Sequence, residues 1–135
     1  MNIKHAVVAG SGQMGPGIAY TLASVGCETK IFARTGDSVE KGMAAFATLL
    51  DVLTEEGCID SSRVGPIREK VSGTSDLASA VLHADLVIES IPENLQLKQE
   101  FFGQIEKACP VEAILTSNTS GLPATSLAEF LEYPG

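Results

Sequence analysis

The sequence has 135 residues, enough for one domain with a single hydrophobic core. Its formal charge of −8 argues against nucleic acid or an anionic membrane as a partner, because binding to either requires a basic surface. No apolar run approaches the ~20 residues that span a bilayer, and a strand-like run begins too soon after Met1 for a signal peptide. The cysteines (Cys27, Cys58 and Cys109) show no CxxC or metal-ligand spacing, so we expect reduced thiols in a cytoplasmic protein and no metal site.

The first half of the sequence alternates between strand-like and helix-like segments. Its predicted elements are, in chain order, a strand over residues 3–9, a helix over 15–26, a strand over 29–33 and a long helix that starts at Asp37 or Ser38. The long helix carries its apolar residues at helical spacing and its acids on other faces, which predicts a solvated outer surface. A turn follows, and then a short helix or loop in which Pro66 suits the first turn better than the interior.

The second half continues the alternation. Its predicted elements are a short strand over 71–76, a brief helix over 77–82, a strand over 84–90, a helix over 93–110, a strand over 113–120 and a last helix over 123–135. The strand "ADLVIES" is apolar along most of its length, as strands buried on both faces of a parallel sheet are. In the helix that ends at Pro110, the spacing predicts an inward face of Leu97, Phe101, Ile105 and Ala108.

This regular alternation predicts an α/β fold. We expect a Rossmann-type, doubly wound parallel sheet that forms a single dinucleotide-binding domain over residues 1–135. Ligands of such sheets bind beyond the carboxyl ends of the strands, where the strand order reverses. The segments that leave those ends are residues 10–15, 33–35, 90–94 and 117–120. We therefore expect the functional site among them.

Gly10, Gly12 and Gly15 form a G-x-G-x-x-G pattern between a predicted strand and a predicted helix. The first glycine permits the tight turn, the second lets the backbone approach a pyrophosphate, and the third lets the helix pack closely on the strand. The helix N-terminus then offers unpaired N–H groups to the phosphates. The pattern predicts dinucleotide binding, with a merely structural glycine turn as the alternative.

The end of the second strand bears on which dinucleotide is bound. NAD sites usually place a carboxylate there, which accepts hydrogen bonds from the ribose hydroxyls, and this sequence has Ala33 instead. Arg34 with Thr35 could bind the 2′-phosphate of NADP, or Arg34 could be an exposed residue that stacks on adenine or points to solvent. The residues leave NAD and NADP both open as the cofactor.

Two longer stretches, "DLVIESIPENLQLKQEFFGQIE" and "AILTSNTSGLPATSLAEFLEYPG", are more specific than the glycine pattern. They resemble the N-terminal domain of the L-3-hydroxyacyl-CoA dehydrogenases, whose G-x-G-x-M-G-x-G-I-A loop is also matched at residues 10–19. The resemblance covers essentially the whole chain, and S-N-T-S together with E-N-x-x-x-K carries most of its specificity. It implies an oxidoreductase of the fatty-acid β-oxidation type, which passes a hydride between nicotinamide and C3 of a 3-hydroxyacyl-CoA.

The resemblance also implies site residues. Glu93 matches the glutamate beside the nicotinamide end of the cofactor, and Lys98 matches the lysine one helical turn on. Asn118 and Ser120 match the polar residues that hold the nicotinamide and the substrate hydroxyl, so they are the expected catalytic residues. The expected cofactor-binding residues are Gly10, Gly12, Gln13, Met14, Gly15, Arg34, Ile91, Glu93, Lys98 and Asn118.

The residues alone allow simpler readings of the same positions. Glu93 would be favourable at any helix N-terminus, and Lys98 would be an ordinary exposed lysine. The stretch "TSNTS" could be a polar turn that caps the next helix.

The sequence departs from the family at two places. The family usually has aspartate at the position of Ala33, and it binds the CoA phosphates with lysines on a helical hairpin that here, over residues 38–60, contains only Lys41 among six acids counted from Asp37. An NADP-dependent dehydrogenase of a small 3-hydroxy acid or sugar acid is therefore an alternative. A non-catalytic NAD(P)-binding module is another.

The family's general base is a histidine that follows the "P-G" region, and we expect it beyond Gly135. His5 and His83 do not replace it, because both fall at the sheet end opposite the cofactor. The family's helical second domain, which supplies most of the dimer interface, is also expected beyond this sequence. We therefore expect these 135 residues to bind the cofactor and to be inactive alone, within a longer enzyme that forms a homodimer.

Overall fold

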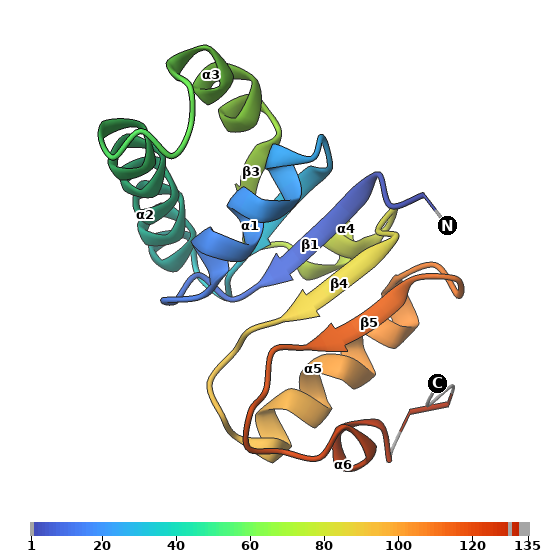
Figure 1. The fold of residues 1–135 in the computed structure, drawn as a ribbon. Coiled ribbons are helices and arrows are strands. Elements are labelled where there is room, and N and C mark those ends of the chain that lie inside the picture. Colours follow the sequence, from blue (N-terminus) through green and yellow to red (C-terminus); the bar gives the residue numbers. More distant parts are fainter. Residues whose placement is uncertain (1, 130, 133–135) are drawn as a thin grey trace.

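The computed structural model describes residues 2–129, 131 and 132. In this part of the chain, five parallel strands form one sheet in the order β3-β2-β1-β4-β5 (Figure 1). The strands are β1 (His5–Ala9), β2 (Glu28–Phe32), β3 (Val71–Thr74), β4 (Leu86–Glu89) and β5 (Ile114–Ser117). The strand order reverses beside β1, because β2 lies on one side of it and β4 on the other. The predicted doubly wound α/β fold is confirmed.

Helices cover both faces of the sheet (Figure 1). They are α1 (Gly15–Ser24), α2 (Gly36–Glu55), α3 (Ser61–Glu69), α4 (Leu77–Val81), α5 (Leu95–Ala108) and α6 (Ala124–Ala128). Adjacent residues of β1 face opposite layers, since Val8 packs with the α1, α2 and α3 side chains and Val7 with those of α4, α5 and α6. The sheet is thus buried on both faces, which explains the apolar strands of the sequence.

Side-chain caps fix where four of the helices begin, in each case by accepting a hydrogen bond from a first-turn N–H. The capping residues are Thr35 for α2, Asp60 for α3, Asp76 for α4 and Asn94 for α5. Because the hydroxyl of Thr35 accepts from the N–H of Ser38, α2 begins at Gly36, slightly before the predicted start. At the other end of α1, Gly26 has a φ of +90° and ends the helix as predicted.

Three details of the sequence-based prediction were wrong. Pro66 lies inside α3, not in its first turn; the ring removes a hydrogen bond to the Ser62 carbonyl, which is tolerable because Ser62 is exposed to water. On α5 the fully buried face includes Lys98 and Phe102, whereas Leu97 is only half-buried. The last strand and helix are shorter than predicted, and residues 130 and 133–135 of the predicted helix lie outside the described residues.

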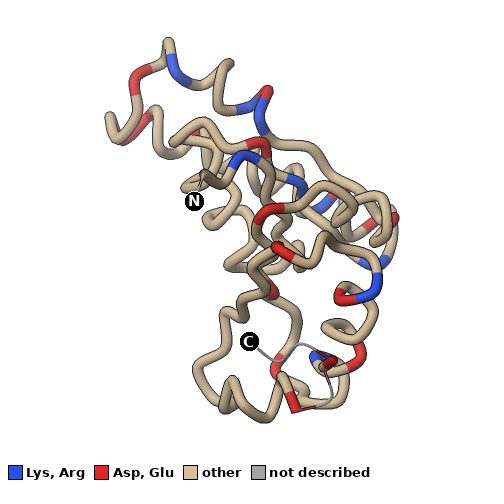
Figure 2. Tube along the Cα trace, turned by 90° about the vertical axis from the view of Figure 1, so that its right-hand side faces the viewer, with Lys and Arg blue, Asp and Glu red and all other residues tan. Residues whose placement is uncertain are grey.

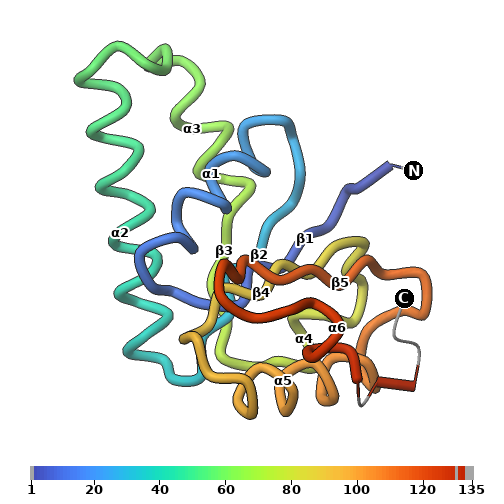
Figure 3. Tube along the Cα trace, turned by 60° about the horizontal axis from the view of Figure 1, so that its bottom comes forward, coloured from blue at the N-terminus to red at the C-terminus, as the bar shows by residue number. Residues whose placement is uncertain are grey.

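The helices α2 and α3 form a hairpin that projects past the sheet (Figure 3). Besides the acids of α2, this hairpin contains two basic residues of α3, Arg63 and Arg68. Both follow residues 38–60, the segment that was predicted as the hairpin. Arg63 donates a hydrogen bond to the Ser24 carbonyl at 2.9 Å. Along the chain, basic positions are scattered among acidic ones (Figure 2). Within the described residues, no helix is long and apolar enough to cross a membrane.

Candidate cofactor-binding site

A cavity of about 640 Å³ lies at the carboxyl ends of β1, β2, β4 and β5. All four segments that the sequence placed at these ends contribute to its lining. The lining residues are Gly10, Ser11, Gly12, Gln13, Met14, Phe32, Ala33, Arg34, Ser38, Ser90, Ile91, Pro92, Glu93, Asn118 and Ser120. The volume is typical of small-molecule sites in proteins. Of the expected site residues, only Gly15 and Lys98 are not part of this lining.

The three glycines of the loop meet different steric conditions. Gly10 has a φ of +132°, and a Cβ there would lie 2.3 Å from the Ser90 carbonyl oxygen at the end of β4. A Cβ on Gly15 would lie 2.1 Å from the Gly10 carbonyl oxygen, so Gly15 permits the close approach of α1 to the loop and does not face the cavity. At Gly12, by contrast, no described residue other than its chain neighbours has an atom within 4 Å of the Cβ position, although Gly12 lines the cavity.

The open space at Gly12 fits the pyrophosphate of a dinucleotide, because a bare backbone there allows a ligand to approach the N–H groups directly. The helix α1 begins just after this point, with Pro16 in its first turn. Among the described residues, no side chain caps this end of the helix. Its first N–H groups and the positive end of its dipole therefore remain available to an anion.

At the end of β2, the cavity wall contains Ala33 and Arg34. Ala33 is buried, and its N–H donates to the Thr74 carbonyl. Arg34 is exposed and forms no hydrogen bond or ion pair with any residue that the structure describes. Ser38 lines the same wall, and its hydroxyl accepts from that of Thr35 at 3.0 Å. No carboxylate belongs to this part of the described lining.

A buried ionic network lies on the other side of the cavity, where β4 leads into α5. The ammonium Nζ of Lys98 lies 2.9 Å from both carboxylate oxygens of Glu89 and 2.8 Å from Oε1 of Glu93. The side chains of Lys98 and Glu89 are fully buried, whereas that of Glu93 is 47% exposed. The ion pair of Lys98 and Glu89 is therefore inside the protein, and the carboxylate of Glu93 lies at the cavity wall.

Hydrogen bonds hold both carboxylates of this network in place. Glu89 also accepts from the N–H of Ile91 and from the hydroxyl of Ser117, which joins β4 to β5. The second oxygen of Glu93 accepts from the hydroxyl of Thr119 at 2.8 Å. Thr119 in turn accepts from the N–H of Leu122, so the turn after β5 is tied to the same network.

These contacts shift the titration of the network's exposed carboxylate and its cation. Hydrogen bonds from Lys98 and Thr119 lower the pKa of Glu93 from its ordinary value. Burial acts to lower the pKa of Lys98, but the hydrogen bonds to Glu93 and Glu89 act in the opposite sense, and the pKa of Lys98 is raised. Glu93 is thus held as an anion and Lys98 as a cation over the physiological pH range.

Lys98 lies beneath the wall of the cavity. It is not an exposed lysine, and it is not one of the residues that line the cavity. Glu89 and Ser117 were missed as members of the site. A signal for Glu89 is present in the sequence, because a carboxylate inside the apolar run "ADLVIES" needs a buried cation as partner. Lys98 lies nine residues later, after one strand-to-helix turn.

The turn after β5 carries the two expected catalytic residues. The N–H of Asn118 donates to the Glu89 carbonyl at 2.7 Å, and Asn118 and Ser120 line the cavity together with Glu93. Both residues are exposed, as a binding site open to a ligand requires. His5 and His83 are exposed and flank the other ends of β1 and β4, as expected.

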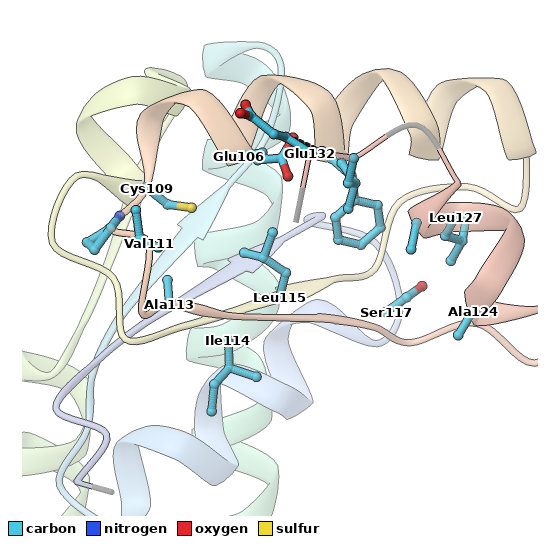
Figure 4. A pocket seen from close by; sticks show the side chains of 14 residues that line it. Glu106, Cys109, Val111, Ala113, Ile114, Leu115, Ser117, Ala124, Leu127 and Glu132 are labelled. Carbon is cyan, nitrogen blue, oxygen red and sulfur yellow. Dashed lines mark hydrogen bonds between the residues drawn. The ribbon is translucent and has the colours of Figure 1, made fainter. Parts of the chain in front are cut away.

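A second cavity, of about 830 Å³, lies beside the outer edge of β5, between α5 and α6. Figure 4 shows Leu115 and Ser117 on the side of β5 that faces α5, and Ile114 on the opposite side. The lining is mainly apolar and contains none of the expected site residues. It is the larger cavity, but the groups that could bind a phosphate or position a nicotinamide lie in the first one.

Comparison with known proteins identifies the family of the chain. Residues 5–135 match the family described as "3-hydroxyacyl-CoA dehydrogenase, NAD binding domain". The chain is 37% identical over 134 residues to the "Probable 3-hydroxybutyryl-CoA dehydrogenase" of Bacillus subtilis (strain 168), covering 99% of this chain and 46% of that protein. It is 33% identical over 133 residues to the 5-formyl-3-hydroxy-2-methylpyridine 4-carboxylate 5-dehydrogenase of Mesorhizobium japonicum, covering 98% of this chain and 42% of that protein.

Among solved structures, the fold matches that of 3-hydroxybutyryl-CoA dehydrogenase from Escherichia coli K12 with a TM-score of 0.92 at 28% identity, covering 99% of this chain and 28% of that one. The chain spans less than half the length of these three proteins. Over its own length, however, the family match is nearly complete. The chain therefore belongs to the 3-hydroxyacyl-CoA dehydrogenase family and corresponds to its NAD-binding domain.

Proposed function

We propose that the cavity at the carboxyl ends of β1, β2, β4 and β5 binds a nicotinamide dinucleotide in extended form. The pyrophosphate would lie on the bare backbone at Gly12 and the N-terminus of α1, contacted by Gln13 and Met14. The adenosine would extend toward Arg34 and the nicotinamide toward Ile91, Glu93 and Asn118. The observation that carries the proposal is the empty Cβ position of Gly12 in a cavity to which all four segments contribute.

We further propose that the whole protein, of which this chain is the cofactor-binding part, oxidises or reduces a 3-hydroxyacyl substrate. The nicotinamide, when bound, would accept or donate the hydride in this reaction. Asn118 would orient the nicotinamide ring, and the hydroxyl of Ser120 would form a hydrogen bond with the oxygen on C3 of the substrate. Both residues work by holding reactants in a fixed orientation. Hydrogen bonds from Lys98 and Thr119 lower the pKa of Glu93, so this carboxylate is poorly suited to take the proton of the alcohol at neutral pH.

The wall at Ala33 and Arg34 favours acceptance of NADP as well as NAD. A carboxylate at this place would repel a 2′-phosphate, and none is part of the described lining. The guanidinium of Arg34 has no protein partner in the described structure, and the Ser38 hydroxyl lies on the same wall. These groups could form charge-assisted hydrogen bonds with a phosphate.

A small hydroxy acid is the second candidate substrate. The hairpin formed by α2 and α3 carries more acids than bases, and Arg63 is already engaged with the Ser24 carbonyl. Such a surface is poorly suited to the phosphates of CoA. The Mesorhizobium japonicum relative acts, by its name, on a pyridine carboxylate rather than on a CoA thioester. In this case the whole protein would bind a small hydroxy acid as its substrate in place of a 3-hydroxyacyl-CoA.

Calorimetric titration of the chain with NAD⁺, NADH, NADP⁺ and NADPH tests the proposed cofactor site. We expect saturable binding at one site per chain, and we expect Arg34→Ala to weaken NADP⁺ by about tenfold or more while changing NAD⁺ little, since a hydrogen bond to a charged group contributes about 1.5–3 kcal/mol. Lys41→Ala, a loss of one positive charge on the outer face of α2, is the matched control. Equal effects of Arg34→Ala on both cofactors would refute the phosphate-binding role of Arg34.

A further inference from the structure

We propose that Gly42, in the interior of α2, is a positioning residue for the glycine loop (residues 10–15). Because Gly42 has no side chain, Ser11 packs directly on α2, and this contact holds the loop where its N–H groups can bind a pyrophosphate. The inference rests on the proposed function of the cavity. It assigns a role in binding to a helix residue that does not line that cavity.

The contact between Gly42 and Ser11 leaves no room for a side chain at position 42. A Cβ there would lie 2.7 Å from the Cβ of Ser11 and 3.3 Å from its Cα, whereas packed carbon atoms are normally about 3.5–4.0 Å apart. The Cβ of Ser11 is bonded directly to the backbone, so no change of rotamer moves it away. Glycine destabilises a helix interior relative to alanine, so its presence within α2 calls for a packing reason. Ser11 supplies that reason.

The helix α2 is the fixed partner in this contact. Gly42, Phe46 and Leu50 lie one turn apart on the buried face of the helix, and Phe46 and Leu50 are 1% and 0% exposed. The same helix lies close on β3, since a Cβ at Gly73 would lie 2.5 Å from Cγ1 of Val39. Moving α2 away from the loop would open this core, which is costly in free energy.

The glycine loop is the partner that can move. The N–H of Gly10 and the carbonyl of Met14 each form a backbone hydrogen bond, at 2.8 and 3.1 Å. Between these two anchors, residues 11–13 form no hydrogen bond with any residue that the structure describes. Packing therefore holds this part of the loop, and Gly42 provides the surface against which Ser11 packs. The N–H groups of residues 11–13 remain available to a ligand.

A methyl group at position 42 would therefore displace the loop and turn its N–H groups away from a bound pyrophosphate. NAD and NADP share the pyrophosphate, so both should lose affinity by the same factor. This distinguishes Gly42 from Arg34, whose replacement should affect mainly NADP⁺. The fold should survive, because the core side chains of α2 keep their contacts.

A double-mutant cycle between positions 11 and 42 tests the inference. The variants are Gly42→Ala, Ser11→Gly and the pair S11G/G42A. The matched control is Gly103→Ala, within α5, where an added Cβ would have no described atom within 4 Å apart from its chain neighbours and the backbone of its own helix. Calorimetry gives the dissociation constants of NAD⁺ and NADP⁺, and circular dichroism gives the melting temperature of the same samples.

We expect Gly42→Ala to raise both dissociation constants by the same factor, about tenfold or more, the effect of losing one hydrogen bond to a charged phosphate oxygen. In the Ser11→Gly background the same change should cost less, because the 2.7 Å contact is absent. Gly103→Ala should leave both constants unchanged. Equal losses in the two backgrounds, or a loss confined to NADP⁺, would refute the inference. A Gly42→Ala chain that no longer folds would also refute it, since the core and not the loop would then need this glycine.

Amide chemical shifts of the cofactor-free, ¹⁵N-labelled chain give a second readout that does not depend on binding. Gly42→Ala should change the shifts of residues 10–14, and it should change them less in the Ser11→Gly background. Changes confined to α2 and β3 would show that the helix moves instead of the loop, and would overturn the inference. A wild-type chain that binds neither NAD⁺ nor NADP⁺ refutes the proposed function and this inference with it. Wild-type affinity in Gly42→Ala, in a chain that binds, refutes this inference alone.

Discussion

Gly12→Ala should weaken cofactor binding without harming the fold, because the protein itself leaves room for a methyl group at Gly12 and a bound pyrophosphate would not. Apart from its chain neighbours, no described residue has an atom within 4 Å of the Cβ position, and φ at Gly12 is not positive, so alanine fits the backbone without strain. Replacing a glycine at such a position usually stabilises a protein by about 0.4–1 kcal/mol, since the unfolded chain loses freedom. We therefore expect an unchanged or slightly higher melting temperature.

Gly12 lines the cavity and its Cβ position is open, so we expect the added methyl group to displace a pyrophosphate from the loop N–H groups. Loss of one hydrogen bond to a charged phosphate oxygen costs about 1.5–3 kcal/mol, which corresponds to a rise in the dissociation constant of about 10- to 150-fold. Calorimetry with NAD⁺ and NADH measures this value directly. Thermal unfolding followed by circular dichroism measures the stability of the same samples.

Gly103→Ala is the matched control, because its Cβ position is equally open and it lies within α5, outside the cavity lining. It should stabilise the chain by about 1 kcal/mol through helix propensity and leave cofactor affinity unchanged. Wild-type affinity in Gly12→Ala would refute the reasoning, because the cofactor would then not lie on this loop. A chain that unfolds when Gly12 is replaced would contradict the structural premise instead.

Other predictions concern folding. Gly15→Ala should destabilise the chain severely in denaturant unfolding, because its Cβ would lie 2.1 Å from the backbone oxygen of Gly10, and wild-type stability would show that α1 is not packed on the loop in this way. Phe46→Ala should cost about 3–5 kcal/mol of unfolding free energy, since this side chain is 1% exposed in the core beneath α2, and a loss below 1 kcal/mol would contradict that burial. Stability should fall as the pH drops below about 4, because the pKa values of Glu93 and Asp85 are lowered in the folded chain by their hydrogen bonds, so the unfolded chain binds more protons there. The raised pKa of Lys98 acts in the opposite sense, and its contribution is lost only when the pH rises above about 10.4, so unfolding curves measured from pH 5 to 9 should show little change from these groups.

The fold could be predicted from sequence because its signals are local. Apolar strands and amphipathic helices alternate along the chain, and each identifies its element without knowledge of the others. The parallel order of the strands follows from the alternation itself. The glycine loop was also readable, since Gly10 and Gly15 meet the steric demands that the pattern implies.

The ionic network could not be placed in the same way, because its members come from three elements. Helical spacing on α5 assigns Leu97 to the core and Lys98 to the surface. In the structure, Lys98 is buried and Leu97 is only half-buried. What decides the matter is the carboxylate of Glu89, which lies on a different element and compensates the buried ammonium. Pro66 is a similar case, since solvent around α3 relieves the lost hydrogen bond that local rules count against it.

The central claim is that the cavity at the carboxyl ends of β1, β2, β4 and β5 holds a nicotinamide dinucleotide. Titration of the ¹⁵N-labelled chain with NAD⁺ and with NADP⁺, followed by amide chemical shifts, tests it residue by residue. The predicted result is saturable shifts in four segments, at residues 10–15, 33–35, 90–94 and 118–120. Shifts confined to the apolar cavity beside β5, or no shifts at millimolar concentrations of either cofactor, would contradict the claim.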